Sequence, residues 1–233
     1  MTERIAGNAE AEPAGQTLRD LVGDAVWTDL VADAVERRHP VGSVLLRQGE
    51  PGTHVLAVLG GVAKVLRHER NGDVTLLAFR GPGELLGEVA VLDDGVRLAT
   101  VEALTECSVA VLSKAEFTRF ASRYELFPVL VRYALTRLRE SDEARGGGDV
   151  LARLAATLVR LADISRDTGR RSGEPLELAL TRNELAQYLR TSRNTVTAKL
   201  AELEPGTVRA HRMRVVVEDL DALRRTAAAL ADG

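Results

Sequence analysis

Residues 181–203 read TRNELAQYLRTSRNTVTAKLAEL, and this stretch indicates how the second half of the chain folds. Thr181 and Glu184 have the spacing of a capping box, in which each side chain satisfies a backbone N–H group of the other residue. Ser192 can cap a second helix. The apolar residues of that helix recur at i, i+4 and i+7 on one inner face: Val196, Leu200 and Leu203. Two short helices joined by a tight turn at residues 190–191 form a helix-turn-helix.

The segment around these helices is basic, although the whole chain carries a net charge of −3. Residues 182–214 hold seven basic and three acidic side chains, and residues 208–217 alternate like a two-stranded wing after the Pro205-Gly206 turn. In a helix-turn-helix the second helix enters the major groove, where arginine pairs with guanine and asparagine with adenine. The alternative is an ordinary helical hairpin with a solvated charged face. We expect double-stranded DNA as the partner, contacted by Arg182, Ser192, Arg193, Asn194, Thr195, Thr197, Lys199, Arg209 and Arg212.

Residues 40–112 alternate short apolar runs with turns that contain glycine. Glycine supplies the positive φ angles of tight turns, and Asn71-Gly72 favours a hairpin. The strand candidates are residues 44–46, 55–59, 62–66, 74–79 and 108–112. Several short strands at regular spacing predict a barrel or sandwich for this half of the chain.

Helical patterns begin at Ser113, which has capping-box spacing with Glu116. Pro128 suits the first turn of a longer helix. One face of this helix is apolar: Phe127, Val131, Ala134, Leu135 and Leu138. The stripe could pack on the β-domain or form a dimer seam, and periodicity alone does not separate the two. Three glycines at 146–148 cannot hold a helix, so they mark a hinge, after which Asp149 can cap the next helix.

The bulk composition is that of a soluble globular protein. Of the 233 residues, 45% are apolar and 28% charged. No run approaches the roughly 18 apolar residues that a membrane span needs. Residues 1–20 lack the apolar region of a secretory signal and are expected to form a disordered leader, which favours a cytoplasmic location without a membrane partner. The single cysteine, Cys107, lies in a strand-like run and is interpreted as a small buried residue rather than a redox sensor.

The sequence contains no constellation typical of a metal site or of catalysis. One cysteine cannot hold an iron–sulfur cluster, and the four histidines lack metal-ligand spacing. No nucleophile–base arrangement and no Walker loop is present. We therefore expect no metal, no haem, no iron–sulfur cluster and no enzyme activity. A ligand-binding subunit or an adaptor that binds no DNA is the alternative from another functional class.

Two motifs resemble the Crp/Fnr family of transcription regulators. Residues 181–186 and 191–196 resemble that family's helix-turn-helix signature. Gly83-Glu84-Leu85-Leu86-Gly87-Glu88, nine residues before Arg97, resembles its phosphate-binding cassette. The resemblance implies an α+β protein with an N-terminal double-stranded β-helix (β-roll), a long dimerisation helix and a C-terminal winged helix-turn-helix. The expected parts are a leader at 1–20, the β-roll at 21–122, the dimerisation helix at 123–145, the hinge at 146–148 and the DNA-binding domain at 149–233.

The resemblance also implies an allosteric mechanism. A cyclic nucleotide, cyclic AMP or a relative of it, would bind inside the β-roll, with its phosphate on Arg97 and its ribose hydroxyl on Glu88. Arg137 would match a family arginine that pairs with the cassette glutamate, and Ser141-Asp142 would lie at the purine. The implied ligand-binding residues are Gly87, Glu88, Val89, Arg97, Leu98, Arg137, Ser141 and Asp142. The resemblance further implies a homodimer through the long helix and RNA polymerase as a partner.

The chain departs from the family's pattern at several positions. Leu98 follows the cassette arginine where the family's nucleotide binders carry Ser or Thr, and one hydrogen bond to a charged group is worth about 1.5–3 kcal/mol. The alternative is therefore another ligand, or a degenerate pocket in which Glu88 and Arg97 form a plain salt bridge and DNA binding needs no ligand. Asn194 replaces a family glutamate, so the operator is expected to differ. Arg190 occupies the turn position where glycine is frequent.

Overall fold

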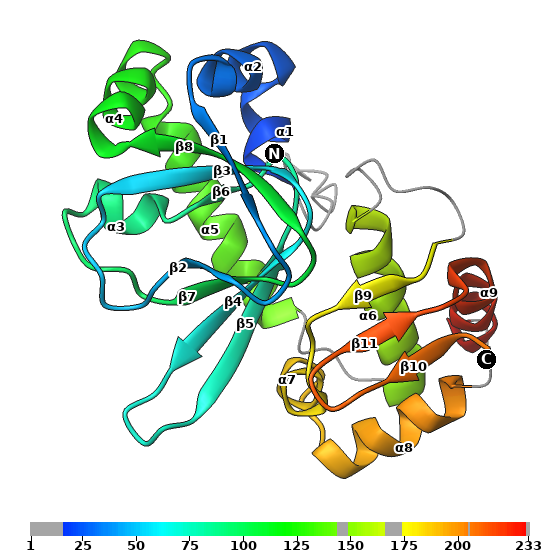
Figure 1. Cartoon of the computed structure of the whole chain (residues 1–233). Helices are drawn as coiled ribbons and strands as arrows, with labels where there is room; N and C mark the ends of the chain where they lie inside the picture. Colours follow the sequence, from blue (N-terminus) through cyan, green and yellow to red (C-terminus); the bar gives the residue numbers. More distant parts are fainter. Residues whose placement is uncertain (1–15, 144–148, 166–173, 205, 232–233) are drawn as a thin grey trace, which may run out of the picture.

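The computed structural model describes residues 16–143, 149–165, 174–204 and 206–231. These residues form two lobes that lie side by side in Figure 1. The larger lobe is rich in strands and contains the first half of the chain. The smaller lobe contains the described residues from 149 onward and is mostly helical.

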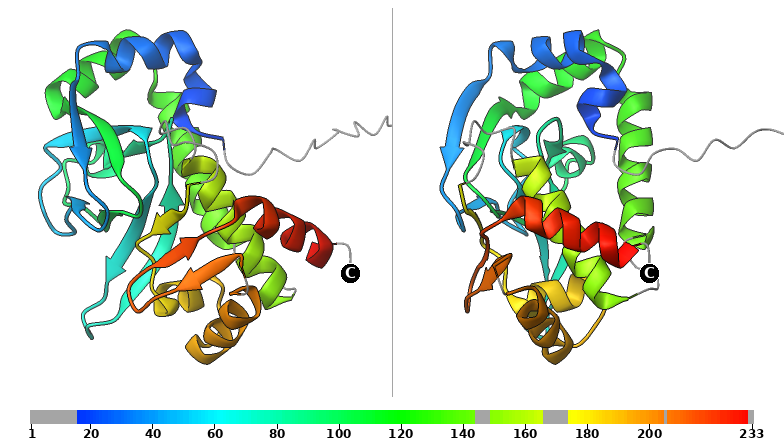
Figure 2. Two further views of the ribbon diagram at one scale, coloured as in Figure 1. Left: turned by 45° about the vertical axis from the view of Figure 1, so that its right-hand side comes forward. Right: turned by 90° about the vertical axis from the view of Figure 1, so that its right-hand side faces the viewer.

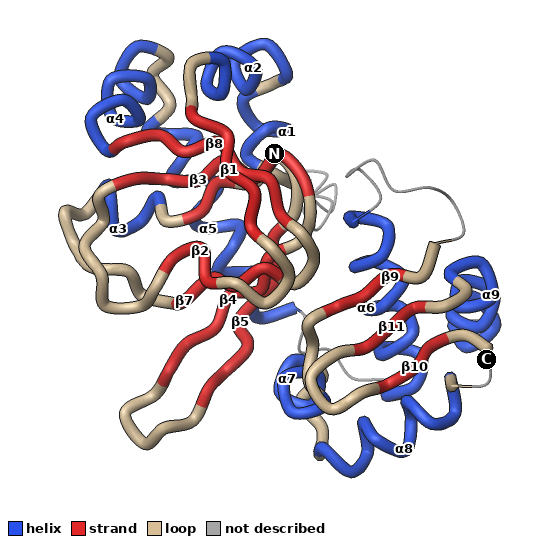
Figure 3. The backbone as a smooth tube through the Cα atoms, viewed as in Figure 1, coloured by secondary structure: helices blue, strands red, loops and turns tan. Residues whose placement is uncertain are grey.

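The larger lobe is a roll of two antiparallel sheets, drawn in red in Figure 3. One sheet has the strand order β1-β8-β3-β6 and the other the order β2-β7-β4-β5. The strands are β1 Val35–His39, β2 Val44–Leu46, β3 His54–Gly60, β4 Ala63–His68, β5 Val74–Arg80, β6 Leu85–Leu86, β7 Thr100–Ala103 and β8 Cys107–Ser113. The predicted β-roll is thereby confirmed.

The strand β3 shows why this lobe has two apolar layers. Successive side chains of a strand point to opposite faces of its sheet. Val55 and Ala57 therefore pack beneath helices, whereas Leu56 and Val58 pack inside the roll, and all four are buried. The helices around the roll are α1 Leu18–Val22, α2 Asp24–Ala32, α3 Glu88–Leu92, α4 Lys114–Arg123 and α5 Phe127–Glu143.

Cys107 lies in the buried layer inside the roll, at the start of β8. Its Sγ atom lies 3.2 Å from the carbonyl oxygen of Val62. Burial raises the pKa of the Cys107 thiol to about 12. The interpretation of Cys107 as a small buried residue is confirmed, because the thiolate that redox chemistry requires is suppressed.

The long helix α5 runs along the outside of the roll, at one edge of the molecule in the right-hand view of Figure 2. Leu130 and Tyr133 are buried against the roll. The other face carries the predicted apolar stripe, where Phe127, Val131 and Leu135 are 43%, 60% and 50% exposed. The stripe therefore does not pack on the β-domain, and the side chain of its last predicted member, at 138, lies outside the described residues.

The smaller lobe is a winged helix-turn-helix, as predicted. Its sheet has the strand order β10-β11-β9. Asp149 caps the first helix, because its carboxylate accepts a hydrogen bond of 3.0 Å from the backbone N–H of Ala152. The elements are α6 Val150–Ser165, β9 Leu176–Leu178, α7 Arg182–Tyr188, α8 Arg193–Leu203, β10 Val208–Ala210, β11 Val215–Val217 and α9 Leu220–Ala231.

The sequence-based prediction differs from the structure at the start of the first lobe and in several strands, since it also assigned no strand to the residues of β6, β7 and β9. Residues 18–20 were assigned to a disordered leader, but they begin α1, where Thr17 and Asp20 form a capping box and Leu18 is buried. The strand β1 was missed because its residues are mostly polar and exposed, so it has no apolar alternation. It is held at the sheet edge by pairing with β8, a contact that sequence periodicity does not reveal. The predicted hinge at 146–148 lies outside the described residues.

None of the described helices is long and apolar enough to cross a membrane. The described residues also contain no group of histidine, cysteine and acidic side chains that could hold a metal ion.

Two turn glycines of the roll differ in the space that a side chain would find, so substitutions there test the packing of the turns. Gly61 and Gly72 have φ angles of +80° and +88°, but a Cβ atom on Gly61 would lie 2.0 Å from the Glu106 carbonyl oxygen, whereas Gly72 has open space. A left-handed conformation costs an L-residue roughly 1–2 kcal/mol. Gly72→Ala should lower the free energy of unfolding by that amount, and Gly61→Ala by clearly more. Urea unfolding of both variants measures the difference, and equal losses would show that no clash exists at Gly61.

Candidate ligand pocket and DNA-binding site

A cavity of about 170 Å³ opens beside the cassette in the larger lobe. Gly87 adopts the left-handed conformation at the start of α3, which lets the chain turn from β6 into this helix. The cavity wall combines apolar residues with a few polar groups, as small-molecule sites usually do. Its polar lining residues are Arg80, Glu88, Arg97, Tyr133 and Arg137.

The guanidinium of Arg97 is held in place by backbone carbonyl groups. It donates one hydrogen bond of 2.6 Å to the oxygen of Gly87 and a second to the oxygen of His54. The residue is only 4% exposed. Its charge is therefore pre-oriented beside the cavity, an arrangement suited to charge-assisted hydrogen bonds with an anion.

Glu88 lines the same cavity and is half-buried. Burial raises the pKa of its carboxyl above the ordinary value, because desolvation disfavours the charged form, although Arg80 and Arg137 oppose this shift. The alternative of a plain salt bridge between Glu88 and Arg97 is not found: both residues are described, and no ion pair joins them. Glu88 thus lines the cavity near Arg97, whose guanidinium is bonded to backbone carbonyl groups.

Arg137 has a different partner from the one that the resemblance implied. Its Nη2 atom lies 3.3 Å from Oε2 of Glu84, four residues before the cassette glutamate, and its guanidinium lies over the Tyr133 ring at 4.5 Å. Glu84 also pairs with Arg80 at 3.3 Å and accepts a hydrogen bond of 3.2 Å from the Tyr133 hydroxyl. This buried cluster ties the strand before the cassette to α5, and sequence spacing contained no signal for it.

Two predicted ligand residues, Val89 and Leu98, lie at the edge of the pocket. Leu98 is 64% exposed at its rim, and Val89 is 39% exposed on α3. The rim is therefore apolar at the position where the family's nucleotide binders carry a hydroxyl group for the phosphate. Ser141 and Asp142 lie in the last turn of α5, and their side chains are outside the described set.

The caps and turn of the helix-turn-helix are confirmed. Thr181 and Glu184 form a reciprocal capping box on α7, and Ser192 accepts a hydrogen bond of 3.0 Å from the N–H of Thr195 at the start of α8. Arg190 has a φ angle of +48° in the turn between them. The turn thus keeps the left-handed geometry that glycine usually provides, although an arginine occupies the position.

The expected DNA-contact residues differ in how available they are to a duplex. Exposed side chains on α8 and the wing are available to a duplex: Ser192, Arg193, Asn194, Thr197 and Arg212. Thr195 is half-buried and its hydroxyl lies 2.8 Å from that of Ser192. Two basic residues are already paired, Lys199 with Glu202 at 2.9 Å and Arg209 with Glu218 at 2.8 Å. A duplex must compete for these two cations with carboxylates of the protein.

Arg182 was predicted to contact DNA, but the structure uses its guanidinium to hold the wing. It donates hydrogen bonds of 3.1 Å and 3.0 Å to the carbonyl oxygens of Ala210 and His211. The residue is half-buried at the start of α7, facing the end of β10. Local sequence could not reveal this role, because the two carbonyls lie 28 and 29 residues further along the chain.

Comparisons with known proteins agree with both lobes. Residues 36–124 match the cyclic nucleotide-binding domain family, and residues 152–226 match the Crp-like helix-turn-helix domain family. The chain is 31% identical to the cyclic AMP receptor protein of Thermus thermophilus, over 87% of this chain and 93% of that protein. It is 29% identical to the CRP-like cAMP-activated global transcriptional regulator of Mycobacterium tuberculosis, over 81% and 86% of the two chains.

Solved structures with the same fold include a CRP-family transcriptional regulator from Thermus thermophilus, with a TM-score of 0.57, 25% identity and coverage of 82% of this chain and 96% of that one. FixK2 from Bradyrhizobium japonicum has a TM-score of 0.56 at 20% identity, over 82% and 96% of the chains. The relatives are transcription regulators and not enzymes. Because the two lobes match the cyclic nucleotide-binding domain family and the Crp-like helix-turn-helix family, and because the chain shows this degree of identity to its relatives, it belongs to the Crp/Fnr family of DNA-binding transcription regulators.

Proposed function

We propose that the protein is a homodimeric regulator in which a cyclic nucleotide in the β-roll alters the affinity of the winged helix-turn-helix for DNA. The observation that carries this proposal is the buried, pre-oriented guanidinium of Arg97 beside a cavity that Glu88 also lines. One group suits a phosphate and the other suits a hydroxyl donor such as a ribose. Relatives named as cAMP-activated regulators make cyclic AMP the first ligand to test.

The exposed stripe on α5 supports the homodimer. Its apolar residues are exposed to solvent in a single copy of the chain, and helices with such stripes commonly pair. A symmetric dimer places two recognition helices on two half-sites of one duplex. The same family membership supports RNA polymerase as a further partner and the cytoplasm as the place of action.

A specific observation favours a second candidate, a regulator that binds DNA without a nucleotide. Leu98 places an apolar side chain at the pocket rim, where it offers no hydrogen bond to a cyclic phosphate. The loss of one such bond is about 1.5–3 kcal/mol, or roughly tenfold to a hundredfold in affinity. Isothermal titration of the full chain with cyclic AMP and cyclic GMP separates the candidates. Binding heat supports the first, and no heat or thermal shift at millimolar nucleotide supports the second.

Substitution of the rim residue tests the pocket directly. Leu98→Ser restores a hydroxyl beside Arg97 and should strengthen cyclic AMP binding by roughly tenfold to a hundredfold. Leu98→Ala is the matched control, since it removes the same bulk without adding a donor. Titration calorimetry compares the three proteins. If the serine variant binds no better than the alanine variant, the phosphate does not approach residue 98 in the manner proposed.

The exposed N-terminal half of α8 supports direct base contacts by Arg193 and Asn194. Arginine can make two hydrogen bonds to guanine, and asparagine can make two to adenine. Arg212 is exposed in the turn between the wing strands, a place suited to a phosphate. We therefore assign sequence selection to α8 and general affinity to the wing.

Two arginine substitutions separate these roles. Arg193→Ala should cost about 1–3 kcal/mol on the selected duplex and relax the preference at one base pair. Arg212→Ala should weaken all duplexes by a similar factor and make the salt dependence shallower. Fluorescence anisotropy on the selected duplex and its single-base variants measures both effects. An unchanged preference after Arg193→Ala would contradict the assignment of base reading to this residue.

A further inference from the structure

The first helix of the helix-turn-helix is docked on the outer face of the β-roll. The ring of Tyr188 on α7 lies 4.9 Å from that of Phe79 on β5, and the side-chain amide oxygen of Gln187 accepts a hydrogen bond of 3.1 Å from the N–H of Leu76. One hydrophobic core continues across this junction, since it contains Val62, Leu66, Leu76, Phe79 and Leu104 of the roll together with the core of the smaller lobe. The two lobes therefore share a packed interface.

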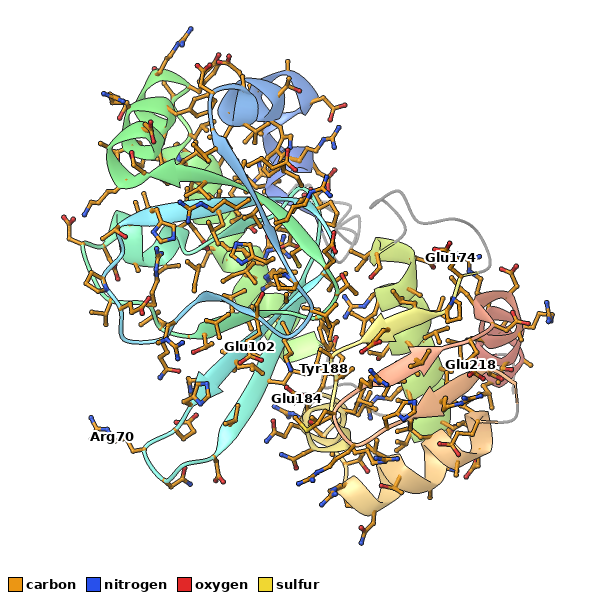
Figure 4. All side chains as sticks on the ribbon, in the orientation of Figure 1. Arg70, Glu102, Glu174, Glu184, Tyr188 and Glu218 are labelled. Atoms are coloured by element: carbon orange, nitrogen blue, oxygen red, sulfur yellow. The ribbon has the colours of Figure 1, made fainter. Side chains whose placement is uncertain are left out.

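A buried lysine lies at the centre of this interface. Lys64 on β4 is 6% exposed, and its ammonium lies 2.5 Å from Oε1 of Glu184 and 3.5 Å from Oε2 of Glu102. It also donates a hydrogen bond of 2.9 Å to the carbonyl oxygen of Ala179, which precedes α7. Figure 4 labels Glu102, Glu184 and Tyr188 together at the junction of the lobes. Lysine is almost never this buried unless it is paired.

The acidic partner on α7 has two functions at once. Glu184 closes the capping box with Thr181 and also receives the Lys64 ammonium. The same carboxylate therefore begins the first helix of the DNA-binding unit and attaches that helix to the roll. A backbone hydrogen bond of 2.8 Å from the N–H of Ala179 to the oxygen of Leu104 crosses the interface nearby.

The other face of the same strands forms the wall of the ligand cavity. Lys64 is paired across the sheet with Glu102 on β7 and with Phe79 on β5, so these three side chains share the outer face. Their chain neighbours point inward, and three of them line the cavity: Val65, Arg80 and Val101. A single layer of sheet thus separates the cavity from α7.

We infer that Lys64 is a positioning residue for the recognition helix: its ammonium, shared by Glu184, Glu102 and the Ala179 carbonyl, fixes the orientation of the helix-turn-helix on the wall of the ligand cavity. This inference rests on the proposed function and adds the contact, between Lys64 and Glu184, through which the roll would position the DNA-binding unit. In a dimer held by α5, the position of α7 on the roll sets where each α8 lies. It therefore sets which half-site spacing the dimer accepts. Close-packed interfaces transmit small displacements rather than absorbing them.

The first experiment measures how often the interface between α7 and the roll opens, in the full chain without ligand or DNA. The N–H groups of Ala179 and Leu76 bond across the interface, so their hydrogen exchange reports its opening. Lys64→Met should speed exchange at both amides by about tenfold or more, since it leaves buried carboxylates without their cation. Arg67→Met is the matched control, because it also replaces a cation by methionine on the same strand, but at an exposed residue. Equal exchange in the two variants would overturn the inference.

A double-mutant cycle distinguishes loss of the contact between Lys64 and Glu184 from a general loss of stability. Glu184→Gln keeps the capping box, because glutamine serves at that position, but removes the charge that Lys64 contacts. If the pair acts together, the double variant should exchange no faster than Lys64→Met alone. Additive effects of the two substitutions would show that they act separately and would overturn the assigned contact.

The second experiment separates positioning from mere attachment. Duplexes selected by the wild-type chain from a random pool are lengthened by one base pair between the half-sites, which turns one half-site by roughly 35°. The wild type should discriminate against the longer duplex more strongly than Lys64→Met, by roughly twofold to thirtyfold. Unchanged discrimination would overturn the positioning role even if exchange rises. If the wild-type chain selects no duplex, both the proposed function and the positioning role are overturned. The hydrogen-exchange data would still show whether Lys64 holds α7 on the roll.

Discussion

The alternation of side chains along β4, β5 and β7 is the constraint on which the rest of the structure depends. Consecutive residues of a strand must face opposite sides of the sheet. In these three strands one side lines the cavity that contains Arg97, and the other packs against the helix-turn-helix. The candidate ligand pocket and the DNA-binding unit therefore share a wall one sheet thick. Because the wall contacts the cavity on one side and the helix-turn-helix on the other, a displacement of its strands would act directly on both.

Buried charge is concentrated at the two sides of this wall. On the cavity side, Glu84 lies between Arg80 and Arg137, and Arg97 is satisfied by backbone carbonyls. On the outer side, Lys64 is satisfied by two carboxylates and a carbonyl. A buried charge without a partner costs several kcal/mol, so each group restrains the segments that supply its partners. These clusters connect the strand before the cassette with α5, and the roll with α7.

The DNA-binding face combines free and restrained groups. Arg193 and Asn194 extend from the start of α8, as direct readout requires, whereas Arg182 holds the wing by its carbonyl groups. The turn before α8 keeps its left-handed geometry with Arg190 in place of glycine. The unit is thus a regular winged helix-turn-helix whose proposed base-reading residues differ from the family's common set. The fold is retained, and the selected sequence is expected to change.

The sequence by itself determined the local elements, because helix caps and amphipathic faces depend on residues three or four positions apart. The capping boxes at Ser113 and Thr181, the helix-turn-helix and the apolar stripe of α5 all followed from such spacings, whereas the exposure of that stripe did not. Only the tertiary structure decided which charges meet. In sequence, Lys64 looks like the solvated residue of an alternating strand, yet its closest carboxylate lies 120 residues further along the chain. Partners at that separation are chosen by packing, which no local pattern records.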